Sequence, residues 1–234
     1  MTKPPWFFID GKVIFMTEKS MDHSRTTKKE VVAAFRTGEI LAAARRLMEQ
    51  KGLDSLTMDE IAQAAGVAKG TLYLYFQSKD ELIQALLSQV AEAMARDLET
   101  VLAAPESPPE KLRRAVTLLL QYVEQERELF PIYLRELVRS KSSREALPFL
   151  RKQEERNLGL LTRLFSEGIA SREFINVNPR LLAYLLKGMG RAVGYYQMTG
   201  EPRESIREAL PVVLKLLFSG IVAPRTAAPE EDAI

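Results

Sequence analysis

The sequence predicts an all-α protein of about nine helices, and three observations support this fold class. Apolar residues recur every three to four positions along most of the 234-residue chain, which is the spacing of one helical face. Proline and glycine interrupt that spacing at intervals of one helix length. Beyond the first residues, no stretch alternates apolar and polar residues as a half-buried strand would.

These breaks divide the chain into four segments. We expect a leader at 1–24, either disordered or a small hairpin, and a three-helix head at 25–80. A larger helical domain follows at 81–222, and the polar, proline-containing end at 223–234 is expected to be a disordered tail.

The leader contains two short apolar runs, Trp6–Ile9 and Lys12–Phe15, on either side of Asp10-Gly11. Asp-Gly is a dipeptide that suits a two-residue hairpin turn. An isolated hairpin is marginal in water, so this one would need a surface to pack on. We therefore prefer an unstructured leader, with Met16 or Met21 as the true translation start, and keep the hairpin as the alternative.

The first helix is predicted from Lys28 to Lys51. Thr27 and Glu30 have the spacing of a capping box, in which each side chain satisfies a backbone N–H at the helix start. Gly52 is suited to end the helix. One apolar stripe runs along its second half: Ile40, Leu41, Ala44, Leu47 and Met48.

Two short amphipathic segments follow between Ser55 and Lys79. The turn that joins them is too short for anything except a tight corner between two helices. A second capping box, Thr57 with Glu60, opens the first segment. Gly66 is suited to end it in a left-handed conformation. The next segment sends Leu72 and Phe76 to one inner face. This pattern predicts a helix-turn-helix. The apolar face of its first segment consists of Met58, Ile61, Ala62 and Ala65.

The outer face of this corner is suited to approach a polyanion. The formal net charge of the chain is only +2, so bulk charge indicates no basic domain. However, no Asp or Glu occurs between Ile61 and Lys79, and DNA is the natural polyanion for such a surface. For Tyr73 and Tyr75, a half-buried structural role is the alternative. The hydrogen-bond donors of this stretch are Lys69, Thr71, Tyr73, Tyr75, Gln77, Ser78 and Lys79.

The stretch AQAAGVAKGTLYLYFQSKDEL, preceded by ILAAARRLMEQKG, resembles the DNA-binding domain of the TetR family of bacterial transcriptional regulators. The resemblance covers about Arg36 to Leu86. It implies that the turn and the third helix enter the major groove of a double-stranded DNA operator, and that the protein is a regulator rather than an enzyme. Physical chemistry adds the backbone amides near Thr57 and Ser78 as phosphate ligands. The implied contacts are Thr57, Lys69, Gly70, Thr71, Tyr73, Tyr75 and, on a phosphate, Lys79. A helical protein-interaction or scaffold module without DNA binding is the alternative.

The remaining helices begin at recognisable signals. Ser78 with Glu81 is a third capping box and opens a long helix that ends in a proline-rich linker at 103–109. Prolines suited to a first helical turn open most of the later helices. We expect these at about Pro109–Gln125, around Leu129–Val138, at Pro148–Ala170, at Pro179–Met198 and at Pro202–Ile221.

The last two helices carry more apolar surface than one small core requires. A single helix-turn-helix covers few base pairs, so a two-fold homodimer on a palindrome is expected. The family resemblance likewise implies a four-helix dimer interface here, and Gly188, Gly190 and Gly194 would allow close helix approach. Closure of a monomer core is the alternative. The expected interface residues are Leu182, Leu185, Leu186, Val193, Ile206, Leu210, Val213 and Leu217.

The resemblance also implies an inducer cavity among the middle helices. The scarcity of charge on their inner faces favours an apolar or amphipathic small molecule, whose binding would release a repressor from its operator. Large residues at helical spacing are often plain core, which is the alternative for each of them. The candidate ligand-binding residues are Tyr122, Phe130, Tyr133, Phe165, Met189 and Tyr195.

Composition argues against other functions. The chain has no cysteine, and its single histidine, His23, lies in the leader, so nucleophilic catalysis and metal binding are not expected and no cofactor is implied. The acidic pair Glu154-Glu155 lies in a charged run and is interpreted as solvated surface. No apolar run reaches the roughly 18 residues of a membrane span, and a secretory signal pattern is missing. We expect a cytoplasmic protein.

Overall fold

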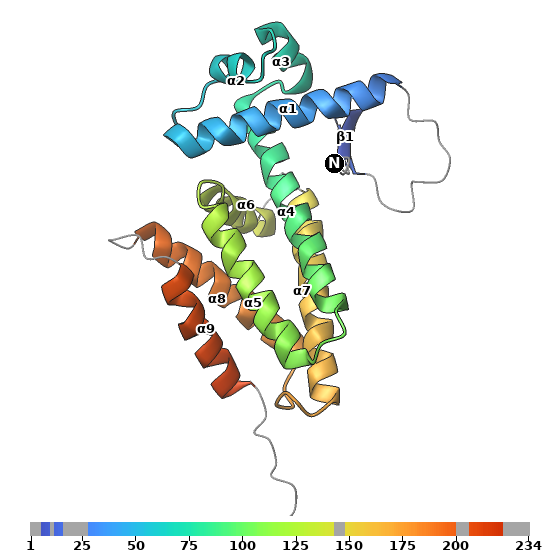
Figure 1. The fold of residues 1–234 in the computed structure, drawn as a ribbon, viewed down its shortest axis with the longest axis vertical. Helices are drawn as coiled ribbons and strands as arrows, with labels where there is room; N and C mark the ends of the chain where they lie inside the picture. Colours follow the sequence, from blue (N-terminus) through green and yellow to red (C-terminus); the bar gives the residue numbers. More distant parts are fainter. Residues whose placement is uncertain (1–5, 10–11, 16–27, 143–147, 200–205, 222–234) are drawn as a thin grey trace, which may run out of the picture. The chain divides into compact units, whose positions relative to one another are not determined.

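The computed structural model describes residues 6–9, 12–15, 28–142, 148–199 and 206–221 (Figure 1). The chain forms two compact units, Met1–Gln89 and Val90–Ile234. The division falls inside one long helix, which begins in the first unit and ends in the second. The predicted tail at 223–234 lies outside the described residues.

The first unit begins with two strands, β1 (Trp6–Ile9) and β2 (Lys12–Phe15). They pair antiparallel, with Trp6 opposite Phe15 and Ile9 opposite Lys12. Our preference for an unstructured leader was therefore wrong for these residues, and the alternative hairpin is present. The physical reason is support: β1 packs against helix α1 (Lys28–Lys51), which provides the surface that an isolated hairpin lacks (Figure 1). The predicted turn, Asp10-Gly11, lies outside the described residues.

Helix α1 has the bounds that the sequence predicts, while its predicted cap Thr27 lies outside the described residues. Gly52 ends the helix with a left-handed φ of 79°, and its N–H donates to the Met48 carbonyl at 2.9 Å. Helices α2 (Met58–Ala64) and α3 (Lys69–Tyr75) complete the head, with α2 packed on both α1 and α3. The buried side chains of α1 follow the predicted stripe and include Ile40, Leu41, Ala44 and Met48.

The described part of the second unit consists of helices joined by short loops. Its predicted helix bounds are confirmed to within a few residues, except that the expected start at Pro202 lies outside the described residues. Together with α1 to α3, the described part of the chain has nine helices, which confirms the all-α fold apart from the N-terminal hairpin. The later helices are α4 (Lys79–Ala103), α5 (Pro108–Gln125), α6 (Phe130–Ser142), α7 (Pro148–Ala170), α8 (Pro179–Thr199) and α9 (Ile206–Gly220).

Helix α5 is central to the second unit, because it packs against α7, α8 and α9. The Phe165 ring belongs to this core and its centroid is 5.8 Å from that of the Phe174 ring. A Cβ on Gly168 would come within 2.1 Å of the Phe174 ring, so glycine is the residue that fits there. The core otherwise consists of aliphatic side chains, among them Leu112, Val116, Leu120, Leu161, Leu164, Leu186 and Leu217.

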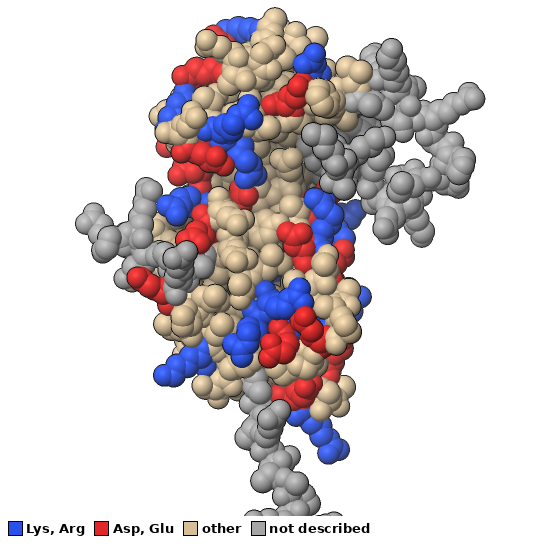
Figure 2. All heavy atoms as spheres, viewed as in Figure 1, with Lys and Arg blue, Asp and Glu red and all other residues tan. Residues whose placement is uncertain are grey.

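Charged side chains of both signs are intermixed over the face shown in Figure 2, with no broad field of one sign. This matches the small formal net charge of +2. In the part of the chain that the structure describes, no helix is long and apolar enough to cross a membrane.

Candidate functional site

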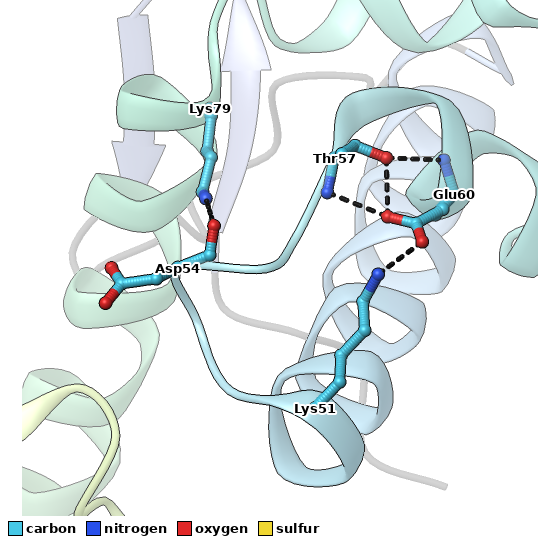
Figure 3. A network of polar contacts seen from close by, with 5 residues as sticks. All are labelled: Lys51, Asp54, Thr57, Glu60 and Lys79. Carbon is cyan, nitrogen blue, oxygen red and sulfur yellow. Dashed lines mark hydrogen bonds and ion pairs between the residues drawn. The ribbon is translucent and has the colours of Figure 1, made fainter.

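The corner between α1 and α2 is held by a reciprocal cap (Figure 3). The Thr57 hydroxyl accepts from the Glu60 N–H at 3.3 Å, and the Glu60 carboxylate accepts from the Thr57 N–H at 3.1 Å. Lys51, the last residue of α1, lies 2.5 Å from the same carboxylate. The hydrogen bond from Lys51, followed by those from Thr57, lowers the pKa of Glu60 to about 2. The predicted capping box is thus confirmed, and Lys51 extends it to α1.

The turn between α2 and α3 has the hydrogen bonds of a Schellman motif. Gly66 takes a left-handed φ of 66°, and its N–H donates to the Gln63 carbonyl at 3.1 Å. The Val67 N–H donates to the Ala62 carbonyl at 3.0 Å. Leu72 and Phe76 are fully buried, as the sequence predicts. The turn therefore fixes which face of α3 points outward.

That outward face contains four of the predicted DNA contacts, and their side chains differ in exposure. Lys69, Gly70 and Tyr73 are exposed, and the exposed fraction of Tyr73 is 41%. Thr71 is half-buried. Tyr75, predicted on the same surface, is also half-buried, which agrees with a partly structural role.

Sequence reasoning missed Leu74 on this surface. Its side chain is 84% exposed, the most of any large hydrophobic residue in the described part of the chain. The signal was present in the spacing: Leu74 lies two residues from both Leu72 and Phe76, which puts it on the opposite side of the helix. An apolar side chain at this place can contact the methyl group of a thymine.

Two predicted lysine contacts have partners within the first unit. Lys69 forms an ion pair with Asp59 on α2 at 2.8 Å, and both side chains are more than 60% exposed, at 61% and 63%. The hydrogen bond to Asp59 raises the pKa of Lys69. Lys79 donates to the Asp54 carbonyl at 3.2 Å and is half-buried (Figure 3). Because an exposed ion pair contributes little free energy, a phosphate can replace Asp59 at Lys69 at low cost.

The backbone amides at the two predicted phosphate positions are partly occupied. At α2, the amides of Thr57 and Glu60 are used by the cap. At the start of α4, the Glu81 N–H donates to the Ser78 hydroxyl at 3.1 Å, and the Glu81 carboxylate accepts from the Gln77 N–H at 2.7 Å. The predicted cap at Ser78 is therefore present, and its carboxylate reaches one residue further back than expected.

The predicted ligand-binding residues do not all come together. Phe130 and Tyr133 are neighbours, with ring centroids 6.0 Å apart. Phe165 and Met189 pack in or against the core, while Tyr195 is 61% exposed. The Tyr122 hydroxyl donates to Asp97 at 2.6 Å, and burial, with this bond, raises the pKa of Tyr122.

Phe130 also lines a cavity of about 260 Å³ between the ends of α5 and α8 and the start of α6. The Phe130 ring lies so close to Gly194 that a Cβ there would come within 2.2 Å of it. The predicted close approach of a partner helix at Gly188, Gly190 and Gly194 stays a prediction. Within one subunit, a Cβ on Gly188 or Gly190 would meet nothing within 4 Å. The other lining residues are Val123, Arg127, Glu128, Pro131, Gly194, Gln197 and Met198.

A buried charge cluster joins α6, α7 and α8. The Glu154 carboxylate accepts from the Tyr133 hydroxyl and, at 3.1 Å, from the Lys187 ammonium, and it lies 3.8 Å from the Arg191 guanidinium. Burial lowers the pKa of Lys187, although the nearby Glu154 carboxylate acts in the opposite direction. Burial, with Glu154, raises the pKa of Tyr133.

Our interpretation of Glu154 as solvated surface was wrong, because the charged run did not reveal which residue of the pair faces inward. Glu155 is exposed.

The predicted dimer residues are divided between core and surface. Leu182, Leu186, Val213 and Leu217 are buried within the second unit, and Val193 and Leu210 pack against its core. Leu185 is 53% exposed, and the side chain of Ile206 lies outside the described residues. A different apolar set is exposed on α8 and α9: Leu181, Tyr184, Leu185, Tyr195 and Tyr196, with Val212 and Leu216.

A capped three-helix head, an outward α3 without acidic residues and a separate helical unit together define a helix-turn-helix regulator. Residues 40–86 match the family model for bacterial regulatory proteins of the tetR family. Residues 105–210 match the model for the tetracyclin repressor-like C-terminal domain. The chain belongs to the TetR family, as the corner motif implied.

Relatives agree with this assignment. The chain is 30% identical over 189 residues to the HTH-type transcriptional regulator YvaF of Bacillus subtilis, covering 80% of this chain and 96% of that protein. A TetR/AcrR-family regulator from Thermobifida fusca has a TM-score of 0.70 at 24% identity, covering 80% and 98% of the two chains. FadR of Bacillus subtilis, solved with stearoyl-CoA, has a TM-score of 0.63 at 23% identity, covering 78% and 98%. YvaF is named a transcriptional regulator, and the two solved structures show that this chain shares their fold.

Proposed function

We propose that this protein is a ligand-responsive repressor, which binds a palindromic operator as a homodimer in the cytoplasm and is released by a small amphipathic molecule. The observation that carries the proposal is the outer face of α3, where Lys69, Gly70 and Tyr73 are exposed beside Leu74. The Schellman turn and the buried Leu72 and Phe76 hold this face outward.

In this proposal, α3 enters the major groove. Lys69 leaves Asp59 for guanine or a phosphate, and Gly70 lets the backbone approach closely. The Thr71 and Leu74 methyl groups contact thymine, and the Tyr73 hydroxyl contacts a phosphate. The Lys79 ammonium has three donor hydrogens, and one of them is used by the Asp54 carbonyl, so it can add a phosphate without losing that carbonyl.

The homodimer would form through the exposed apolar face of α8 and α9. Leu181, Tyr184 and Leu185 follow one another at helical spacing on α8, and Val212 and Leu216 do so on α9. Gly188 has open space around it, which would allow a partner helix to approach closely. This proposal replaces Leu182, Leu186, Val213 and Leu217, because residues buried in one subunit cannot also contact another.

Release by a ligand requires two conformations with different head spacing. A ligand that binds better to the conformation that does not fit the operator lowers DNA affinity by that difference. The complex of FadR with stearoyl-CoA supports the idea that this fold accommodates an organic ligand. The buried charge cluster and the cavity beside Phe130 are the features of this chain that fit such a role.

DNA binding can be tested on a duplex selected by the protein from a random library. We expect Lys69→Ala to weaken binding by about tenfold and to reduce the slope of log affinity against log salt by roughly one. Lys152→Ala, which removes an exposed lysine from α7, is the matched control and should change neither quantity. Fluorescence anisotropy across a salt series measures both. Salt-independent binding, or no selected site at all, would favour the protein-interaction alternative.

A further inference from the structure

The buried charge cluster, defined as Tyr133 on α6, Glu154 on α7 and Lys187 and Arg191 on α8, is a feature that DNA binding and dimer formation do not require. The side chains of Lys187 and Glu154 are only 8% and 16% exposed. Burying an ion pair costs desolvation energy, and apolar packing of the same volume is often at least as stable. A role in ligand binding would explain why charges occupy this position in a helical core.

The cluster holds more positive than negative charge. Lys187 and Arg191 are both within 4 Å of Glu154, at 3.1 Å and 3.8 Å. Both cations share the Glu154 carboxylate. The four side chains of the cluster therefore carry one more positive than negative formal charge, and burial lowers the pKa of Lys187. A ligand with a single negative charge would neutralise the cluster.

The cavity beside Phe130 lies one helical turn from the cluster. Tyr133 follows Phe130 by three residues on α6, and Gly194 follows Arg191 by three residues on α8. The ring of Phe130 lies against Gly194 in the cavity wall, and its centroid is 6.0 Å from that of the Tyr133 ring in the cluster. The Arg191 side chain is 31% exposed, which leaves it accessible from outside the cluster.

The cavity wall is mostly apolar, and its two charges oppose each other. Val123, Phe130, Pro131 and Met198 supply apolar surface, while Arg127 and Glu128 contribute one charge of each sign. The cavity of about 260 Å³ is many times the space that one water molecule needs, so it can hold a small organic molecule.

We propose that the cavity and the charge cluster together bind a small amphipathic carboxylate, whose apolar part lies against Phe130 and whose carboxylate is held by Lys187 and Arg191. The inference rests on the proposed function, for which it names the ligand class. The carboxylate competes with Glu154 for both cations, so binding would weaken the contact between α7 and α8. That loosened contact is the structural change that the ligand would impose on the second unit.

The test uses the full-length protein without DNA, titrated calorimetrically with octanoate, 1-octanol and octylamine. These probes have the same chain and differ in the charge of the head group. We expect octanoate to bind at least about tenfold more tightly than the other two, because each 1.4 kcal/mol of charge pairing is a factor of ten. Equal binding of octanol, or no binding of octanoate at millimolar concentration, would contradict the proposal.

Two variants distinguish ligand binding from a merely structural role. Arg191→Met should weaken octanoate binding by about tenfold. Glu154→Gln should strengthen it several-fold, because the competing carboxylate is gone while the size of the side chain is kept. Arg163→Met removes an exposed arginine from α7 and is the control for the first variant. If Glu154→Gln does not fold, Arg191→Met decides, since that side chain is partly exposed and its loss is better tolerated. Unchanged octanoate affinity in the folded variants would overturn the proposal.

A separate measurement keeps this inference distinct from the proposed function. Anisotropy of the selected duplex, with and without octanoate, reports release from DNA. Octanoate binding without any change in DNA affinity would support the site and contradict its role as an inducer site. DNA binding that is intact in a protein unable to bind octanoate would contradict the site alone.

Discussion

Each of the two units of this protein contains a glutamate that is bound by a lysine. The two ion pairs differ in burial, and therefore in the free-energy cost of losing a partner. In the first unit, Glu60 joins Lys51 at a partly exposed helix start. In the second, Glu154 joins Lys187 inside the helical core. Water screens the first pair, so its partners can be exchanged at little cost. The second pair is desolvated, so removal of either charge is expensive. The first arrangement suits a surface that meets DNA, and the second suits a site that responds to an anion.

The largest expected effect tests the buried pair. Glu154→Gln should lower the free energy of unfolding by about 3 kcal/mol, because it leaves Lys187 buried with a neutral partner. Glu155→Gln, on the exposed neighbour, should change it by less than about 0.5 kcal/mol. Urea unfolding followed by circular dichroism measures both. Equal effects at the two positions would mean that the difference between buried and exposed pairs does not hold here.

The second, smaller effect concerns two positions that require glycine for different physical reasons. Gly194→Ala should cost about 2 kcal/mol, because its methyl group would overlap the Phe130 ring at 2.2 Å. Gly66→Ala should cost about 1 kcal/mol for backbone strain, since φ is 66° while the space around it is open.

Gly190→Ala is the control for both, because it has open space and no positive φ, and it should be neutral or slightly stabilising. The stability of each variant is measured by the same urea unfolding. A tolerated Gly194→Ala would show that Phe130 can move aside, which is the motion that ligand entry requires.

The smallest expected effect concerns pH and the exposed pair. The pKa of Glu60 falls from 4.5 to about 2 on folding, so the charged form favours the folded state. Its stabilising contribution is complete above pH 4.5 and is lost as the pH falls toward 2. Thermal unfolding between these pH values should therefore show a smaller loss in Glu60→Gln than in the wild type. Identical pH dependence of the two proteins would contradict the role of Lys51 and Thr57 at this cap.

The helix boundaries could be predicted from the sequence because their determinants are local. The Thr57 and Glu60 cap joins residues three positions apart, and the Gly66 turn needs one residue with access to a left-handed φ. Ser78 and Glu81 likewise open α4 where their spacing predicts it. The outward face of α3 also followed from spacing, although Leu74 was overlooked on it.

The tertiary structure alone decided which of several apolar or charged residues face inward. On α8, Leu182 and Leu185 belong to the same sequence pattern, yet one is buried and the other is 53% exposed. Glu154 and Glu155 are adjacent, and one of them reaches Lys187 on another helix. The hairpin gained its support from α1. The sequence by itself thus determined the helices and the reading corner, because hydrogen bonds between near neighbours fix them. Burial and charge pairing depended on which helices pack together, and those contacts join residues far apart in the chain.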